Sequence, residues 1–113
     1  MQQVAEGSCH CGSVRVMVAR PPTEVTECHC SICLRYGALW AYYPSGEVTL
    51  TGPTTVYAWG RRQVGFHHCG TCGCVVGWLP LGEGFGHCAV NARMLEGFDP
   101  EAVTRILEED ASG

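Results

Sequence analysis

Seven of the nine cysteines in this chain are grouped in three short segments, and this grouping points first to metal chemistry. The segments are Cys9-His10-Cys11, Cys28-His29-Cys30-Ser31-Ile32-Cys33 and Cys69-Gly70-Thr71-Cys72. A C-x-C or C-x-x-C segment supplies two thiolates from one piece of backbone. A zinc ion held by four cysteines is closed and structural, whereas one held by three keeps a fourth position for water or substrate. Seven ligands divide into four and three, so the sequence predicts two zinc ions with different roles.

The cellular compartment decides between metal ligation and disulfide bonding. The N-terminal segment Met1-Gln2-Gln3-Val4-Ala5-Glu6 has neither the basic start nor the apolar core of a signal peptide, so we expect a cytoplasmic protein. Thiols stay reduced there, and closely spaced cysteines are then metal ligands more often than disulfide partners. No apolar stretch approaches the ~20 residues that a membrane span requires. We therefore expect metal binding and no contact with a membrane.

Composition and charge narrow the class of protein further. The chain has 113 residues, 46% of them hydrophobic and 16% charged, with a formal net charge of −4. This length and composition predict a single folded domain over residues 1–113. Arg61-Arg62 is the only basic pair, and no run of Lys or Arg offers a stripe for phosphates. A small zinc-ribbon protein that binds nucleic acid is therefore disfavoured.

Short strands separated by turns are the elements that must position the cysteines. Alternating or apolar segments bounded by Gly and Pro predict a small all-β domain. The predicted strands are residues 13–19, 24–27, 39–43, 48–51, 55–59, 64–68, 75–79 and 88–91. A glycine-rich loop with Gly82, Gly84 and Gly86 precedes the last of them. Beyond it, Asp99-Pro100-Glu101 resembles a helix start, although residues 103–107 would also form a closing strand.

Four motifs, taken in order, resemble one family. They are Gly7-Ser8-Cys9-His10-Cys11-Gly12-Ser13-Val14, the segment from Cys28 to Cys33, Cys69-Gly70-Thr71-Cys72-Gly73, and Val90-Asn91-Ala92-Arg93-Met94-Leu95. The chain is similar to the glutathione-dependent formaldehyde-activating enzymes, whose domain is shared with centromere protein V. The resemblance implies a small tent-like, multi-sheet all-β domain of the Mss4-like type, stabilised by zinc. It also favours the closing strand over residues 103–107.

The resemblance also implies a role for each cysteine segment. Four cysteines from the first and third segments would hold a structural zinc: Cys9, Cys11, Cys69 and Cys72. Cys28, Cys30 and Cys33 would hold the catalytic zinc. The implied activity is that of a carbon–sulfur lyase, which forms or cleaves a thiol–aldehyde adduct of the S-hydroxymethylglutathione type. The implied partners are a small thiol, such as glutathione, and an aldehyde such as formaldehyde.

Two cysteines without a motif role, Cys74 and Cys88, keep a second interpretation open. Either could close the three-cysteine site as a fourth ligand, and the chain would then be a non-catalytic, zinc-stabilised binding module. The observation that separates the two interpretations is an open position beside the second metal, inside a cleft.

Other polar residues near the segments have simpler expected roles. Alternation along the backbone should point His10 and His29 away from the metal that their neighbours bind. His68 is a candidate proton shuttle. Asn91 precedes a turn and is expected to hydrogen-bond the backbone.

Overall fold

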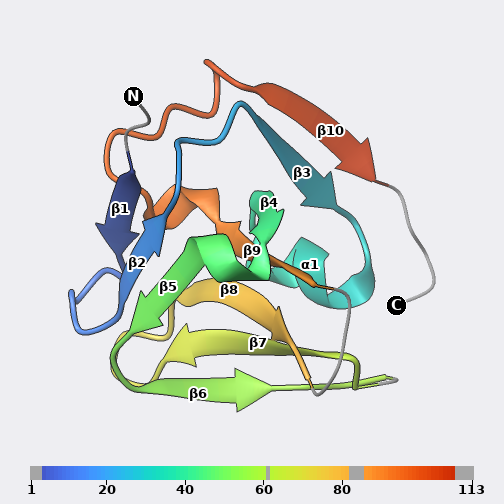
Figure 1. The fold of residues 1–113 in the computed structure, drawn as a ribbon. Coiled ribbons are helices and arrows are strands. Elements are labelled where there is room, and N and C mark those ends of the chain that lie inside the picture. The colour runs from blue at the N-terminus through green and yellow to red at the C-terminus, as the bar shows by residue number, and fades with distance from the viewer. Residues whose placement is uncertain (1–3, 61, 82–85, 109–113) are drawn as a thin grey trace.

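The computed structural model describes residues 4–60, 62–81 and 86–108, and these ranges are mostly β-strand (Figure 1). The elements are β1 (Ala5–Ser8), β2 (Arg15–Val18), β3 (Glu24–Cys28), α1 (Ser31–Tyr36), β4 (Trp40–Pro44), η1 (Ser45–Glu47), β5 (Val48–Thr51), β6 (Thr54–Tyr57), β7 (Val64–Cys69), β8 (Val75–Pro80), β9 (His87–Asn91), η2 (Ala92–Met94) and β10 (Thr104–Glu108). The α-helix is a single short segment. The all-β prediction is therefore confirmed.

The strands form two sheets. A three-stranded sheet has the order β1-β2-β5, and a seven-stranded sheet has the order β10-β3-β4-β9-β8-β7-β6. In Figure 1 the large sheet runs from β10 at the upper right, past β4 and β9 in the middle, to β6 at the bottom. Among the described residues, β10 and β3 are the one parallel pair, with Thr104 opposite Glu24. The last described strand, β10, thus pairs with β3, which leads into the segment from Cys28 to Cys33.

The strands predicted between residues 13 and 91 are all present, and their ends differ from the prediction by no more than two residues. The closing strand is also confirmed as β10. The alternative prediction of a helix that starts at Asp99 is wrong. The Asp99 carboxylate instead accepts a hydrogen bond from the backbone N–H of Glu101 over 2.9 Å, within a turn. Gly82, Gly84 and Arg61 lie outside the described residues.

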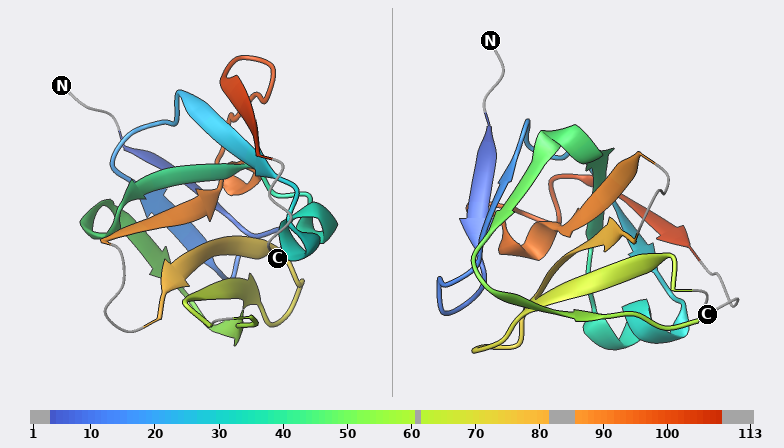
Figure 2. Two further views of the ribbon diagram at one scale, coloured as in Figure 1. Left: turned by 90° about the vertical axis from the view of Figure 1, so that its right-hand side faces the viewer. Right: turned by 60° about the horizontal axis from the view of Figure 1, so that its bottom comes forward.

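Two apolar cores lie on opposite faces of the large sheet, because successive side chains of a strand point to opposite sides. On β4 and the residue before it, Leu39 and Ala41 belong to the first core, whereas Trp40 belongs to the second. On β9, Val90 belongs to the first core and Ala89 to the second. The first core also includes β2 and therefore fills the space between the two sheets. The second core is covered by α1 (Figure 2).

The helix α1 is an element that the periodicity did not reveal. It follows Cys30 directly and ends at Gly37, which adopts the left-handed conformation with φ 66° and donates its N–H to the carbonyl of Cys33 over 3.0 Å. Only Cys33 of its residues is buried. Six residues are too few to show a helical repeat of apolar positions. In the part of the chain that the structure describes, no helix has the length and apolarity of a membrane span.

Candidate metal centres

The first cysteine group gathers four sulfur atoms from two loops that are distant in sequence. The Sγ atoms of Cys9, Cys11, Cys69 and Cys72 all lie within 4.8 Å of one another. Cys11 Sγ is 3.7 Å from Cys9 Sγ and 3.6 Å from Cys69 Sγ, across 58 positions of sequence. Four sulfurs at the usual Zn–S distance of about 2.3 Å stand about 3.8 Å apart in a tetrahedron. The spacing of these sulfurs therefore fits a four-coordinate zinc ion.

The two loops that carry this group have similar backbone hydrogen bonds. In the β1–β2 loop, the N–H of Cys9 donates to the carbonyl of Val14 over 3.0 Å. In the β7–β8 loop, the N–H of Cys69 donates to the carbonyl of Cys74 over 3.0 Å. In each loop a glycine with positive φ, Gly12 or Gly73, donates back to the first cysteine. Each hairpin thereby presents two sulfurs on the same side.

Hydrogen bonds to the sulfurs prepare this group for metal binding. Ser13 Oγ lies 3.0 Å from Cys11 Sγ and 3.4 Å from Cys69 Sγ. The backbone N–H groups of Thr71 and Cys72 donate to Cys69 Sγ over 3.3 and 3.4 Å. The Ser13 hydroxyl and these N–H groups lower the pKa of Cys69 to about 5. Because the thiolate is the form that binds metal, these hydrogen bonds favour the ligating state.

The second cysteine group comes from one short stretch of chain. The sulfurs of Cys28, Cys30 and Cys33 lie within 4.8 Å of one another. Cys28 ends β3, Cys30 is the residue before α1, and Cys33 lies in the first turn of that helix. The helical turn brings Cys33 back over Cys30, which an extended segment could not do. The six-residue segment therefore needs α1 to gather its three sulfurs.

The three sulfurs differ in their surroundings. Burial raises the pKa of Cys28 and of Cys33. Burial opposes ionisation of Cys30 as well, but hydrogen bonds from the backbone and thiol of Cys33 outweigh it and lower the pKa of Cys30. The indole Nε1–H of Trp40 donates to Cys33 Sγ over 3.3 Å. The donor holds the Cys33 sulfur in place from within the second core.

A cleft of about 190 Å³ opens beside the three-cysteine group. Cys28 and Cys33 lie in its wall, together with residues 37–39, which follow α1. No fourth cysteine, histidine or carboxylate joins the three sulfurs among the residues that the structure describes. The second group therefore has three sulfurs and an adjoining cleft.

Charged side chains from three elements line this cleft. Glu27, on β3, accepts from His29 Nε2 over 2.8 Å and pairs with Arg105 Nη1 of β10 over 3.4 Å. The hydrogen bond from His29, with the charges of Arg105 and Arg93, lowers the pKa of Glu27. Arg93, on η2, donates from Nε to the carbonyl of Gly37 over 3.1 Å. The parallel pairing of β10 with β3 is what places Arg105 at this site.

The remaining sequence-predicted residues lie outside both sulfur groups. Cys88 is fully buried in β9, and Cys74 contacts the backbone of His10 and the thiol of Cys72 beside the first group. Neither belongs to the three-cysteine group. His10 is exposed, and His68 does not line the cleft. Asn91 hydrogen-bonds the backbone as expected, because its Oδ1 accepts from Leu39 and its Nδ2 donates to Val75.

Sequence reasoning missed four residues that shape the two groups. They are Ser13 at the first group and Trp40, Arg93 and Arg105 at the second. Arg93 and Ser13 lie inside the quoted motifs, so their position was a usable signal. No sequence signal pointed to Arg105, because its contact with Glu27 depends on the pairing of β10 with β3, two strands distant in sequence.

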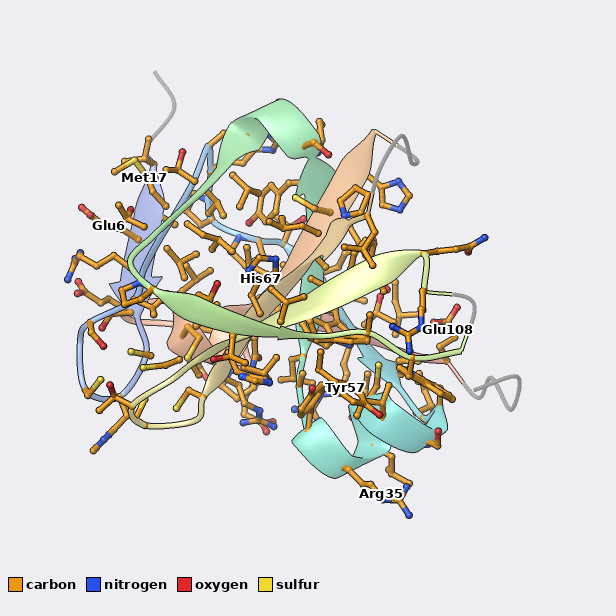
Figure 3. All side chains as sticks on the ribbon, turned by 90° about the horizontal axis from the view of Figure 1, so that it is seen from below. Glu6, Met17, Arg35, Tyr57, His67 and Glu108 are labelled. Carbon is orange, nitrogen blue, oxygen red and sulfur yellow. The ribbon has the colours of Figure 1, made fainter. Side chains whose placement is uncertain are left out.

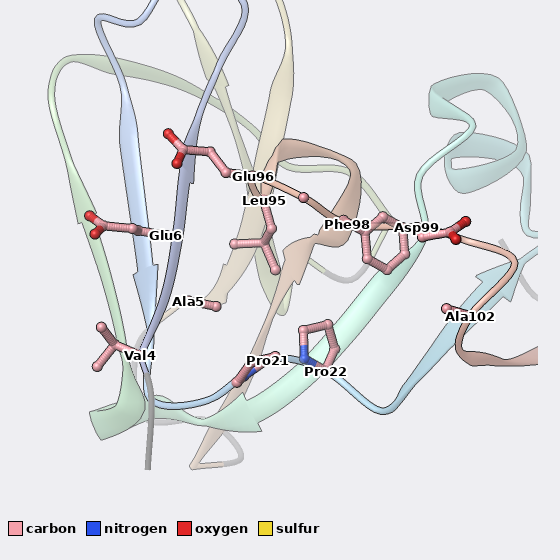
Figure 4. A pocket seen from close by; sticks show the side chains of 11 residues that line it. Val4, Ala5, Glu6, Pro21, Pro22, Leu95, Glu96, Phe98, Asp99 and Ala102 are labelled. Carbon is pink, nitrogen blue, oxygen red and sulfur yellow. The ribbon is translucent and has the colours of Figure 1, made fainter. Parts of the chain in front are cut away.

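A larger cavity, of about 430 Å³, lies elsewhere in the molecule (Figure 4). It is lined by side chains of β1, of the segment between β2 and β3, and of the segment after η2, among them Ala5, Pro22 and Phe98. No cysteine lines it. The smaller cleft, by contrast, combines two thiols with charged side chains.

Together, the fold and the two thiol groups define a small all-β domain with two cysteine clusters that could hold metal ions. The sequence model of a family described as glutathione-dependent formaldehyde-activating enzyme matches residues 4–104. The chain belongs to this family.

Two similar proteins accompany this family match. A crystal structure of a Rhodobacter sphaeroides protein superposes with a TM-score of 0.76 and 26% sequence identity, over 90% of this chain and 97% of that one. A Halomonas elongata protein, named as a candidate glutathione-dependent formaldehyde-activating enzyme, is 59% identical over 29 residues. That match covers 25% of this chain and 18% of the relative.

Proposed function

We propose that this protein is a zinc-dependent carbon–sulfur lyase that forms or cleaves a thiol–aldehyde adduct of the S-hydroxymethylglutathione type. Cys28, Cys30 and Cys33 are the proposed ligands of the catalytic zinc. Cys9, Cys11, Cys69 and Cys72 are the proposed ligands of a structural zinc. The proposed substrates are a small thiol, glutathione above all, and formaldehyde, and the proposed location is a reducing compartment such as the cytoplasm. All nine cysteines are free thiols in the structure, as this chemistry requires.

The observation that carries the proposal is the contrast between the two sulfur groups. The first has four sulfurs and is complete as a tetrahedral site. The second has three sulfurs and adjoins a cleft of about 190 Å³. A site with three protein ligands keeps a position for an incoming group. When bound there, a zinc ion would acidify an incoming thiol and so favour its thiolate form at neutral pH.

The proposed reaction is an addition in which atoms and electrons balance. The thiol sulfur forms a bond to the carbonyl carbon of the aldehyde, while the π bond of the carbonyl and the S–H bond break. The thiol proton is transferred to the oxygen, and the product is the S-hydroxymethyl thioether. Cleavage is the reverse, so neither direction needs an oxidant or a reductant.

Residues around the cleft support this chemistry by position. Trp40 fixes the sulfur of Cys33 through its Nε1–H. The absence of a side chain at Gly37 leaves open space, since a Cβ built there would meet no atom within 4 Å among the described residues. The ion pair between Glu27 and Arg105, with His29 on the other carboxylate oxygen, keeps a polar wall beside Cys28. The Glu27–Arg105 ion pair, the hydrogen bond between His29 and Glu27, and the sulfurs of Cys28 and Cys33 thus line the cleft where substrate would enter.

Metal analysis combined with an adduct assay tests the proposal. We expect the parent protein to bind two zinc ions and a Cys30→Ser variant to bind close to one, with the far-ultraviolet circular dichroism unchanged. Cys88→Ser is the matched control, because Cys88 is buried but belongs to neither sulfur group. Exchange between glutathione with formaldehyde and the adduct is measured by nuclear magnetic resonance, and we expect acceleration by the parent and the control only.

Three outcomes would contradict the proposal. If the parent holds a single zinc, or if Cys30→Ser unfolds, the division into four and three ligands fails. If the parent holds two zinc ions without accelerating exchange, the chain is better described as a zinc-stabilised binding module.

A further inference from the structure

We propose that Arg93 is a specificity-determining residue, which binds a carboxylate of the thiol substrate in the cleft beside Cys28 and Cys33. The inference rests on the proposed function, because it names the thiol class that the same site would accept. That class is a low-molecular-weight thiol carrying a carboxylate. The argument comes from the charges and hydrogen bonds of the cleft.

Arg93 is held at the rim of the cleft by a bond that leaves its outer nitrogens available. Its Nε donates to the carbonyl of Gly37 over 3.1 Å, and Gly37 is part of the cleft wall. This bond fixes the direction of the planar guanidinium. An arginine side chain carries five N–H donors, and the paired outer ones match the two oxygens of a carboxylate. The side chain is exposed, so a ligand can reach it.

Arg105, the second arginine of the cleft, is already engaged. Its Nη1 lies 3.4 Å from Glu27 Oε1, so its charge is balanced within the protein. No ion pair joins Arg93 to a carboxylate among the residues that the structure describes. Apart from its cysteines and His29, the lining carries two arginines and one glutamate as charged side chains. Because Glu27 pairs with Arg105, Arg93 is the cation of this lining that is left to attract an anion.

The size of the cleft limits what can bind there. Drug-sized ligands usually occupy pockets of roughly 300–1,000 Å³, whereas this cleft measures about 190 Å³. It has room for the thiol-bearing part of a ligand with a nearby carboxylate, and the rest of a larger thiol would extend into solvent. Discrimination among thiols must then come mainly from the charge near the sulfur. A single arginine at the rim is suited to that task.

The experiment separates carboxylate binding from sulfur chemistry. The probe is S-methylglutathione, which keeps the carboxylates of glutathione but has no free thiol. Its diethyl ester, which keeps the ammonium group but has no carboxylate, is the comparison. Binding to the zinc-loaded protein is measured by calorimetry for the parent, Arg93→Gln, Arg93→Lys and Arg35→Gln. Arg35 is the matched control, since it lies on α1, donates to the Ser31 carbonyl and is not among the cleft-lining residues. Its side chain extends outward from the helix (Figure 3). Zinc content and circular dichroism verify each variant.

We expect Arg93→Gln to weaken S-methylglutathione binding about 10-fold or more, the size of a lost charged hydrogen-bond pair. Arg93→Lys keeps the positive charge but lacks the paired N–H donors of arginine. Its affinity for S-methylglutathione should therefore lie between those of the parent and Arg93→Gln. Arg35→Gln should match the parent, and the diethyl ester should bind weakly to every protein. The Lys variant carries the test if Arg93→Gln does not fold.

The outcomes also separate this inference from the proposed function. Unchanged binding in both Arg93 variants, equal weakening of acid and ester, or no binding to the parent would overturn the inference. Equal rates of adduct formation with glutathione and with its diethyl ester would also overturn the inference, although the lyase proposal would stand. Arg93-dependent binding of S-methylglutathione without any adduct formation would support the carboxylate site while the lyase proposal failed.

Discussion

The indole nitrogen of Trp40 lies 3.3 Å from the sulfur of Cys33, and both side chains are buried. Trp40 belongs to β4, near the middle of the large sheet, whereas Cys33 belongs to α1. This hydrogen bond ties the three-cysteine group to an interior strand of the large sheet. The indole N–H also serves as a hydrogen-bond donor to the Cys33 sulfur, so a thiolate at this buried position needs no water molecule as a donor.

Replacing Trp40 by Phe tests this link. The change keeps an aromatic ring in the second core but removes the donor, so we expect unfolding free energy to fall by about 1–2 kcal/mol. Zinc affinity at the three-cysteine group should decrease several-fold, measured by competition with a chromophoric chelator. The four-cysteine group is the internal control, and an equal loss at both groups would mean general destabilisation instead.

The hydroxyl of Ser13 provides a pH-dependent prediction. Hydrogen bonds from Ser13 and from the N–H groups of Cys72 and Thr71 lower the pKa of Cys69 from 9.0 to about 5. A lowered pKa means that the folded chain favours the thiolate. This contribution to stability is complete above pH 9, declines as the pH falls, and is lost below about pH 5.

We therefore expect a pH-dependent difference between the parent and Ser13→Ala, both reduced and free of metal. The parent should be the more stable at pH 8, and the difference should shrink as the pH approaches the lowered pKa of about 5. Urea unfolding at a series of pH values measures it. A difference that stays constant across this window would show that Ser13 acts through packing rather than through the Cys69 thiolate.

Asn91 joins three backbone segments around the cleft. Its Oδ1 accepts from the N–H groups of Leu39 and Arg93, each over 3.3 Å, and its Nδ2 donates to the carbonyl of Val75 over 3.0 Å. An Asn91→Ala change would leave these buried groups without partners, at a cost of about 2–4 kcal/mol. Thermal unfolding measures the loss. Asn91→Asp keeps the acceptor but sets an oxygen opposite the Val75 carbonyl in place of the donor, so it should also be destabilised. A variant as stable as the parent would contradict this account.

Gly7 lies where β1 crosses the backbone after η2. A Cβ at this position would stand 1.9 Å from the carbonyl oxygen of Met94 and 2.7 Å from the Cα of Leu95. Because backbone atoms cannot move aside as a side chain does, we expect Gly7→Ala to cost at least about 2–3 kcal/mol. Gly46→Ala is the control, since a Cβ there meets nothing within 4 Å among the described residues. Equal melting temperatures for the two variants would refute the clash.

Removal of metal should affect the two groups unequally. The four-cysteine group joins loops 58 positions apart, whereas the three-cysteine group lies within one segment. A metal that links distant segments contributes directly to folding. We expect Cys69→Ser to lower the melting temperature of the zinc-loaded protein far more than Cys30→Ser, as followed by circular dichroism. A larger effect of Cys30→Ser would assign the structural role to the other group.

Strand positions were accessible from the sequence because alternation is a local signal. Residues 48–51, for example, were predicted as a strand with the same ends as β5. Local signals failed where an element depends on its partner. β1 contains Gly7 and has no clear alternation, and it exists because it pairs with β2. The six residues of α1 are too few for a helical period.

Residue types and short spacings alone indicated seven clustered thiols, a division into four and three, and a set of short strands. Those features depend on residue types and spacings within a few positions. Three further features follow from tertiary packing: Cys11 meets Cys69, the two sulfur groups adjoin separate cores, and Arg93 and Arg105 reach the cleft beside Cys28. These contacts depend on which strands pair and in what register. Register is a property of the packed sheet as a whole, so no short stretch of sequence contains it.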